Sequence, residues 1–396
     1  MNNATSIVRD SIPRIRQIVP HMQDQLIGLR SSNTFESARI LYGKTVDRLS
    51  IWGQGRRTAS RVGDRDRYWS STRDVLDEAM RLGFVEPQPL PSARRYVDSH
   101  RSRMLTLTKL GHQAADEAET NVPAFYDRLA SSLYTKHPYF CEFIDSLRIK
   151  PIHCPEVSEG DVEQAGRSRF RTQYWVEYAE PRLQLSATDS NSNALIYRAL
   201  VSVIRKRFGN SRRRAPTNKQ MAEALNDAYI EAALKTRNLS SGPTDLKNMK
   251  TWGSQLMLLD QSRYVPNYEG QNVIWLAIDS TEQVRALLKR KTLKEHEYSL
   301  ADAVVTTYRD QASNTKTSRL QAPYLPIYQI RAQTAFDHSV TRALVDLVIE
   351  RLANGSISIS NVQVLLHLGT TRQPQSEPVY RRGGKRRYEI TIQSTS

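Results

Sequence analysis

Basic side chains are the residues in this sequence whose spacing most clearly predicts chemistry. They gather in three short stretches that hold few acids. The first stretch contains Arg94, Arg95, Arg101 and Arg103, the second Arg205, Lys206, Arg207, Arg212, Arg213 and Arg214, and the third Arg381, Arg382, Lys385, Arg386 and Arg387. Arginine and lysine neutralise phosphates and release counterions, so such clusters are typical of proteins that bind a nucleic-acid backbone. We expect these residues, together with Arg372, to contact double-stranded DNA.

The charge of the whole chain agrees with a polyanionic partner. Its 396 residues include 57 Lys and Arg against 41 Asp and Glu, which gives a formal charge of +16. No stretch approaches the roughly eighteen uninterrupted apolar residues of a membrane span, and no apolar signal segment follows the first basic residues. The two cysteines, Cys141 and Cys154, fit a reducing compartment. These observations favour a cytoplasmic, nucleoid-associated protein with no membrane partner.

Other chemistries find less support in the residues. Neither phosphate-binding glycine motif, GxxxxGK[ST] or GxGxxG, is present. Asp279 and Glu282 follow an apolar strand-like segment, but the acid-x-Lys pair of a carboxylate–metal nuclease does not accompany them. His153 and Cys154 are adjacent, yet no second Cys or His lies at zinc-ligand spacing. We therefore expect no metal and no cofactor, and a protein that binds rather than catalyses.

The third basic stretch lies within a predicted β-hairpin, residues 376–393. Apolar and polar residues alternate from Tyr388 to Gln393, which is typical of a half-buried strand. Gly383 and Gly384 can supply the positive φ angles that a tight hairpin turn requires. The five basic residues would then surround the tip of the hairpin.

Two helices are predicted before this hairpin. Residues 341–352 have apolar side chains at helical spacing, and Asn354-Gly355 is a stop signal. Ser360 can cap a second helix over 361–368. Helix, turn, helix and basic hairpin in this order resemble a winged-helix domain. The resemblance implies that the second helix enters the major groove while the hairpin lies along the backbone.

A similar order occurs near the N-terminus. A capped helix reaches Gly83, a short strand begins at Phe84, and a basic, proline-rich excursion over 87–103 returns as the strand MLTLT before Thr108 caps a further helix. The sequence LGFVEP…RSRMLTLTKLGHQAADEAE resembles the end of many bacterial winged-helix domains. This resemblance implies a second module with its own basic wing.

The order appears a third time in the middle of the chain. A helix begins at Thr217 or Asn218, a turn follows at 240–243, a second helix begins after Thr244, and an excursion over 263–270 leads into a strand at 272–278. The second helix would expose polar residues able to read base edges. These residues are Lys247, Asn248, Lys250, Thr251, Ser254 and Gln255.

One enzymatic alternative rests on another resemblance. The segment with His338, Arg342, His367 and Tyr380 is similar to the C-terminal part of a tyrosine recombinase, in which His and Arg share a helix and Tyr is the nucleophile. The spacing here is H-x-x-x-R in place of H-x-x-R, and Leu-Leu-His-Leu-Gly inverts the Gly-His order. Cationic groups of this kind would stabilise a phosphoryl transition state.

The sequence thus predicts a mainly helical α+β chain with two or three tandem winged-helix modules. The predicted boundaries are a helical arm at 1–35, modules at 36–120, 191–310 and 336–396, a connector at 121–190 and a linker at 311–335. The expected function is non-catalytic binding of double-stranded DNA, as a subunit of a DNA-processing assembly in replication initiation, a mobile element or phage defence. The alternatives are a sequence-specific transcription regulator and the recombinase-like enzyme. We expect other protein subunits or a homo-oligomer as partners.

Overall fold

The computed structural model is an α+β fold, mainly helical with small antiparallel sheets. It describes residues 18–30, 36–37, 74–87, 104–155, 157–165, 217–235, 237, 239, 243–266, 268, 271–277, 293–314, 322–368, 381–382 and 385–394. The chain divides into two compact units, each built from separate segments: the first from 1–144, 241–256 and 282–288, the second from 145–240, 257–281 and 289–396.

Three small sheets repeat one strand order. In each, the third strand along the chain lies between the first and the second, and all neighbours are antiparallel. The first sheet contains β1 (Glu36–Ser37), β2 (Val85–Pro87) and β3 (Met104–Leu107), the second β4 (Ile152–Pro155), β5 (Leu259–Ser262) and β6 (Gln271–Leu276), and the third β7 (Leu325–Pro326), β8 (Val362–His367) and β11 (Glu389–Ser394). Helical residues stand between the first and second strands of every sheet, and the second and third strands pair directly.

The first unit combines the sheet β1–β3–β2 with helices. These are α1 (Ile18–Arg30), a helix over 74–81, α4 (Lys109–Thr120), α5 (Val122–Lys136), α11 (Pro243–Gln255) and the first part, to Ile144, of α6 (Pro138–Ile149). Local signals set several boundaries. Thr108 caps α4 by accepting the Gly111 N–H, and its hydroxyl donates to the Gly83 carbonyl. Gly83 has a φ of 78°, as a helix C-terminal glycine should. The predicted arm is packed on α4, where Gln23 Nε2 donates to the Ala118 carbonyl at 2.8 Å.

The second unit contains the other two sheets and their helices. The helices are α7 (Glu159–Ala165), α10 (Asn218–Lys235), α12 (Leu293–Ser313), α13 (Ile327–Asp337) and α14 (Arg342–Ala353). α10 starts with a reciprocal capping box, since the Gln220 N–H donates to the Thr217 hydroxyl while Gln220 Oε1 accepts the Thr217 N–H. Thr341 caps α14 by accepting the Leu344 N–H. α14 ends at Asn354 and Gly355, where the sequence predicts its end.

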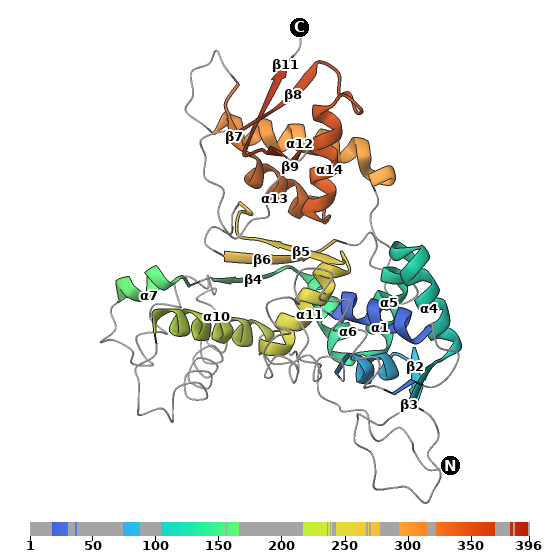
Figure 1. Cartoon of the computed structure of the whole chain (residues 1–396). Coiled ribbons are helices and arrows are strands. Elements are labelled where there is room, and N and C mark those ends of the chain that lie inside the picture. The colour runs from blue at the N-terminus through green and yellow to red at the C-terminus, as the bar shows by residue number, and fades with distance from the viewer. Residues whose placement is uncertain are drawn as a thin grey trace, which may run out of the picture. The chain divides into compact units, whose positions relative to one another are not determined.

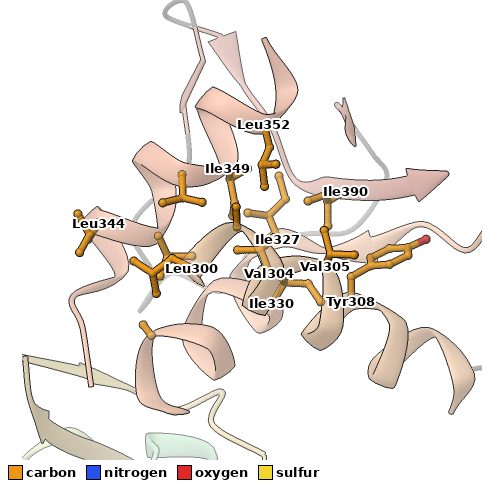
Figure 2. Packing of buried hydrophobic residues seen from close by; sticks show 14 of the residues in the cluster. Leu300, Val304, Val305, Tyr308, Ile327, Ile330, Leu344, Ile349, Leu352 and Ile390 are labelled. Carbon is orange, nitrogen blue, oxygen red and sulfur yellow. The ribbon is translucent and has the colours of Figure 1, made fainter. Parts of the chain in front are cut away.

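One apolar core joins α12, α13 and α14 to the sheet β7–β11–β8. Figure 2 shows Val304, Ile330 and Ile349 from the three helices converging with Ile390 of β11. Val265, Val273 and Trp275 belong to the same core, although they come from the excursion after β5 and from β6 of the middle sheet. The two sheets of the second unit therefore share one apolar core. The helices and strands that contribute to this core are labelled in Figure 1.

Two sequence predictions are wrong in this region. Residues 361–368 do not form a helix: β8 occupies Val362–His367 and pairs with β11 at six positions. The reason is that a short, mostly apolar segment such as VQVLLH fits a strand as well as a helix, and Asn361 adopts a φ of 61° in a turn instead of starting a helix. The predicted linker at 311–335 contains β7 and most of α13, whose Ile327 and Ile330 are core residues.

The predicted C-terminal hairpin exists, with a different partition of its strands. β9 (Arg381–Arg382) pairs with β10 (Lys385–Arg386) across Gly383 and Gly384. The alternating segment that follows is β11, and its partners are β7 and β8. β11 is the central strand, and Glu389 and Thr391 are buried together with Ile390 and Ile392. Among the described residues, no helix is long and apolar enough to cross a membrane.

Candidate nucleic-acid interface

The turn between β9 and β10 brings like charges into register. Arg382 is paired with Lys385, and Arg381 with Arg386, across the two-stranded ladder. Like charges placed directly opposite each other in an antiparallel pair destabilise it. A bound polyanion would remove that repulsion. The backbone arrangement is thus unfavourable in isolation and suited to an anionic partner.

Three further side chains lie close to the base of this hairpin. His367 is opposite Glu389, and the register of β7 continues to place Tyr324 beside the same strand. The Tyr324 and His367 rings meet edge to face with centroids 4.6 Å apart. Glu389 lies on the same face as His367, because residues directly opposite each other in an antiparallel pair share a face, and Arg387 precedes β11 by two residues. We call Tyr324, His367 and Arg387 the wing-base cluster.

The wing-base cluster combines buried and exposed polar atoms. Nε2 of His367 and Nε of Arg387 are buried and have no hydrogen-bond partner among the described residues. Tyr324 and Leu368 are each 60% exposed. Glu389 is buried and has a partner of its own. The part of the cluster that a ligand can reach is therefore the Tyr324 ring with its hydroxyl and the exposed part of Arg387.

At the start of α14, a second group of acidic and basic side chains forms ion pairs within the protein. Asp260 of β5 accepts the main-chain N–H of Arg342 at 2.6 Å, its Nε at 3.1 Å and its Nη2 at 2.9 Å. One turn further along, Asp346 pairs with the buried Arg331 of α13 at 3.2 Å. Burial raises the pKa of Asp346 to about 6, although Arg331 and Arg342 act in the opposite direction. Two acids and two arginines therefore form one balanced network.

The middle hairpin, between β5 and β6, packs against the C-terminal helices. Tyr264 contacts Tyr328 of α13 with ring centroids 4.6 Å apart. Trp275 of β6 meets Phe336 edge to face, and its Nε1 donates to the Val340 carbonyl at 2.9 Å. These contacts fix the corner between α13 and α14 onto the middle sheet.

One residue on the predicted base-reading face of the middle helix is buried. Asn248 of α11 is only 2% exposed, so its placement on an exposed face was wrong. Lys247, Lys250 and Gln255 are partly exposed. The helix buries Trp252 against His137 and Phe140 within the first unit. The sequence pattern missed this because every polar residue between apolar anchors was taken as solvent-facing.

α10 and α11 also belong to different compact units. The predicted module boundaries at 36–120, 191–310 and 336–396 stay predictions, since each unit combines distant parts of the chain.

Most of the other predicted contact residues lie outside the described part of the chain. These are Arg94, Arg95, Arg101, Arg103, Arg205, Lys206, Arg207, Arg212, Arg213, Arg214 and Arg372. For Arg381, Arg382, Lys385 and Arg386 the structure describes the strand pairing alone. Arg387 is partly exposed next to β11.

The residues of the recombinase resemblance are separated in the structure. His338 follows the end of α13, whereas Arg342 begins α14 and is held by Asp260. His367 lies on β8, and Tyr380 is outside the described residues. The family pattern requires the His and the Arg to share a helix, and His338 and Arg342 do not.

Within the described ranges, no group of three or more His, Cys, Asp or Glu side chains could hold a metal ion. Comparisons of the chain with protein-family models, with curated proteins and with solved structures found no match.

Proposed function

We propose that the chain is a double-stranded DNA-binding protein built from winged-helix-like modules and that it acts without catalysing a reaction. The observation that carries the proposal is the like-charged register of β9 and β10, in which two basic pairs face each other. Such a hairpin is stabilised by a line of phosphates. The overall charge of +16 supports a partner of the same kind.

The repeated sheet order supports the modular part of the proposal. Each sheet follows helical residues with two adjacent antiparallel strands, as expected when a helix–turn–helix unit is followed by a wing. The first excursion, 88–103, carries Arg94, Arg95, Arg101 and Arg103. The third carries the β9–β10 hairpin. Two of the three wings would therefore bring positive charge to DNA.

A role in a DNA-processing assembly follows from the number of modules. Several weak backbone contacts on one chain give strong binding together, because the second contact is made at high effective concentration. A protein of this design suits the organisation of DNA for other subunits, in the cytoplasm at the nucleoid. Purification from cells with and without nuclease treatment identifies those subunits.

The test is a salt series of binding isotherms on a labelled random duplex. With about six phosphate contacts, affinity should fall about a thousandfold between about 50 and 200 mM salt. A single-stranded RNA of the same length is the comparison ligand. An isotherm that hardly moves with salt, or tighter binding to the RNA, contradicts the proposal.

A further inference from the structure

We infer that the C-terminal module meets DNA through its wing and the wing-base cluster, and that α14 is a packing helix withheld from the groove. This inference rests on the proposed function and names the contact surface for it. A helix–turn–helix reader normally presents the N-terminal residues of its second helix to base edges. Here α14 holds the position of that second helix, directly before β8.

The N-terminus of α14 is already occupied by an anion of the protein itself. A helix N-terminus and an arginine fork are both favourable sites for phosphate. Asp260 fills both, since it accepts the Arg342 main-chain N–H and two hydrogen bonds from the guanidinium. The exposed fractions of the two side chains are 11% for Arg342 and 15% for Asp260. Phosphate or base edges would have to displace a buried carboxylate to reach this end of the helix.

The exposed face of α14 has the wrong chemistry for a phosphate backbone. Glu350 is partly exposed there, and the exposed Arg351 pairs with Glu297 of α12. Leu347 is 48% exposed beside an apolar hollow lined in part by Met257 and Ala343. Acidic side chains would repel the phosphates of DNA, and apolar side chains would give them no hydrogen bonds. This side of the helix is therefore not a groove-binding surface.

The middle sheet covers the neighbouring approach to the same helix pair. Tyr264 and Tyr268 of the β5–β6 excursion contact Tyr328 and Phe336 of α13, with ring centroids 4.6 and 5.8 Å apart. The excursion is thus used for packing within the second unit. A duplex could not lie along α13 without removing it.

The wing side carries donors suited to phosphate. Its hairpin carries the two like-charged pairs, and close to its base lie Tyr324, His367 and Arg387. Phosphate oxygens accept hydrogen bonds from tyrosine, imidazole and guanidinium groups. Tyr324 is exposed and Arg387 is partly exposed, so both can meet a phosphate. The partner surface is therefore the phosphate backbone of duplex DNA, read without base contacts from α14.

The experiment places a negative or a positive charge on α14 and measures the change in DNA affinity. This change is compared with the effect of removing a positive charge at the wing base. Leu347→Glu and Leu347→Lys are assayed in the full chain by fluorescence anisotropy on a random duplex at about 150 mM salt, where charges more than ~8 Å apart are screened. We expect both variants to bind within about twofold of the wild type, whereas a helix in the groove would separate them in opposite directions by about tenfold. Arg387→Ala should weaken binding by roughly three- to tenfold and reduce the salt slope by about one.

Opposite effects of Leu347→Glu and Leu347→Lys on affinity overturn the inference, as does an unchanged salt slope for Arg387→Ala. Thermal melts of all variants check that they fold, and Tyr324→Phe supplies a wing-base change that leaves the ring in place and removes only the hydroxyl. We expect Tyr324→Phe to weaken binding by about twofold or more, and unaltered binding counts against the cluster. Failure of the wild type to bind duplex DNA in a salt-dependent manner contradicts the proposed function instead, so the two failures are distinct.

Discussion

Asp260 and Arg342 are joined by three hydrogen bonds, one from the Arg342 main chain and two from its guanidinium, although 82 residues separate them. The pair links β5 of the middle sheet to the first residue of α14. It belongs to a network with Asp346 and Arg331 that has equal numbers of positive and negative charges. The network holds two sheets of the second unit in one arrangement.

Asp260→Ala should destabilise the second unit by about 2–4 kcal/mol, because it leaves the Arg342 guanidinium without its partner in a mostly buried place. Asp260→Asn should cost less, since its amide oxygen still accepts one N–H. Urea denaturation followed by tryptophan fluorescence measures both, with Trp275 close to the pair. If Asp260→Ala and Asp260→Asn unfold at the wild-type midpoint, the network does not contribute to stability.

Gly111→Ala should severely destabilise the first unit. A Cβ at this position would overlap the main-chain carbonyl of Phe84 and lie 2.8 Å from its carbon, and neither backbone atom can move freely. The expected loss is about 3 kcal/mol or more, as for other overpacked core positions. Gly160→Ala is the matched control, because its nearest neighbour is a side-chain oxygen at 3.7 Å and alanine favours the α7 helix. Thermal melts in which both variants behave alike would show that the close approach of α4 is not required.

Glu78 should make the stability of the first unit fall as pH rises. Burial raises the pKa of Glu78 from 4.5 to about 7, against the opposing effect of Arg81. The folded state therefore keeps a proton that the unfolded state loses, so the contribution is complete below pH 4.5 and disappears as pH rises to about 7. Glu78→Gln removes this dependence and should be more stable than the wild type at about pH 8, by up to about 3 kcal/mol. Chemical denaturation at several pH values gives the profile, and parallel curves for the two proteins would contradict it.

His137 should act in the opposite pH direction within the same unit. Burial and the charge of Arg81 lower the pKa of His137 from 6.5 to about 4. Its Nδ1 accepts the Phe140 N–H at the start of α6, a bond that requires the neutral ring. The stabilisation is present above pH 6.5 and is lost as pH falls to about 4, when the unfolded state binds the proton first.

His137→Asn keeps an acceptor for the cap and removes the titration, so its stability should change less between about pH 7 and 4 than that of the wild type. The packing of His137 against Trp252 is lost in this variant, which lowers stability equally at every pH. A constant difference between the two proteins across the range would therefore refute the titration.

Local signals in the sequence were sufficient to predict where helices begin and end. They were insufficient to predict which distant residues and strands pair with one another. The break between α5 and α6 at His137-Pro138, the cap at Thr108 and the stop at Gly355 depend on a few neighbouring residues, so they could be predicted. β8 was mistaken for a helix because its pairing with β11 is not local. No nearby residue indicates that Asp260 binds Arg342.

The candidate site divides in the same way. The basic hairpin and its Gly383-Gly384 turn could be read from composition and turn chemistry. Tyr324 was not identified because it meets His367 only when β7 and β8 flank β11. His367 entered the sequence argument through a different resemblance, that of a recombinase. Side-chain contacts that depend on which strands pair could not be predicted from residue pattern and spacing.

Lys385→Glu should separate DNA affinity from folding stability. It converts the Arg382–Lys385 pair into an opposite-charge pair, which stabilises an antiparallel ladder by roughly 0.2–1 kcal/mol. The same change removes one cation and adds an anion at the wing, so DNA affinity should fall by about tenfold and the salt slope by about one to two. Lys150→Glu is the matched control, since it changes the net charge equally at an exposed position that is not part of the hairpin. Anisotropy titrations at two salt concentrations and thermal melts are made on both variants. If Lys150→Glu weakens binding as much as Lys385→Glu, affinity follows net charge alone, and the paired basic residues of β9 and β10 are not a phosphate-binding wing.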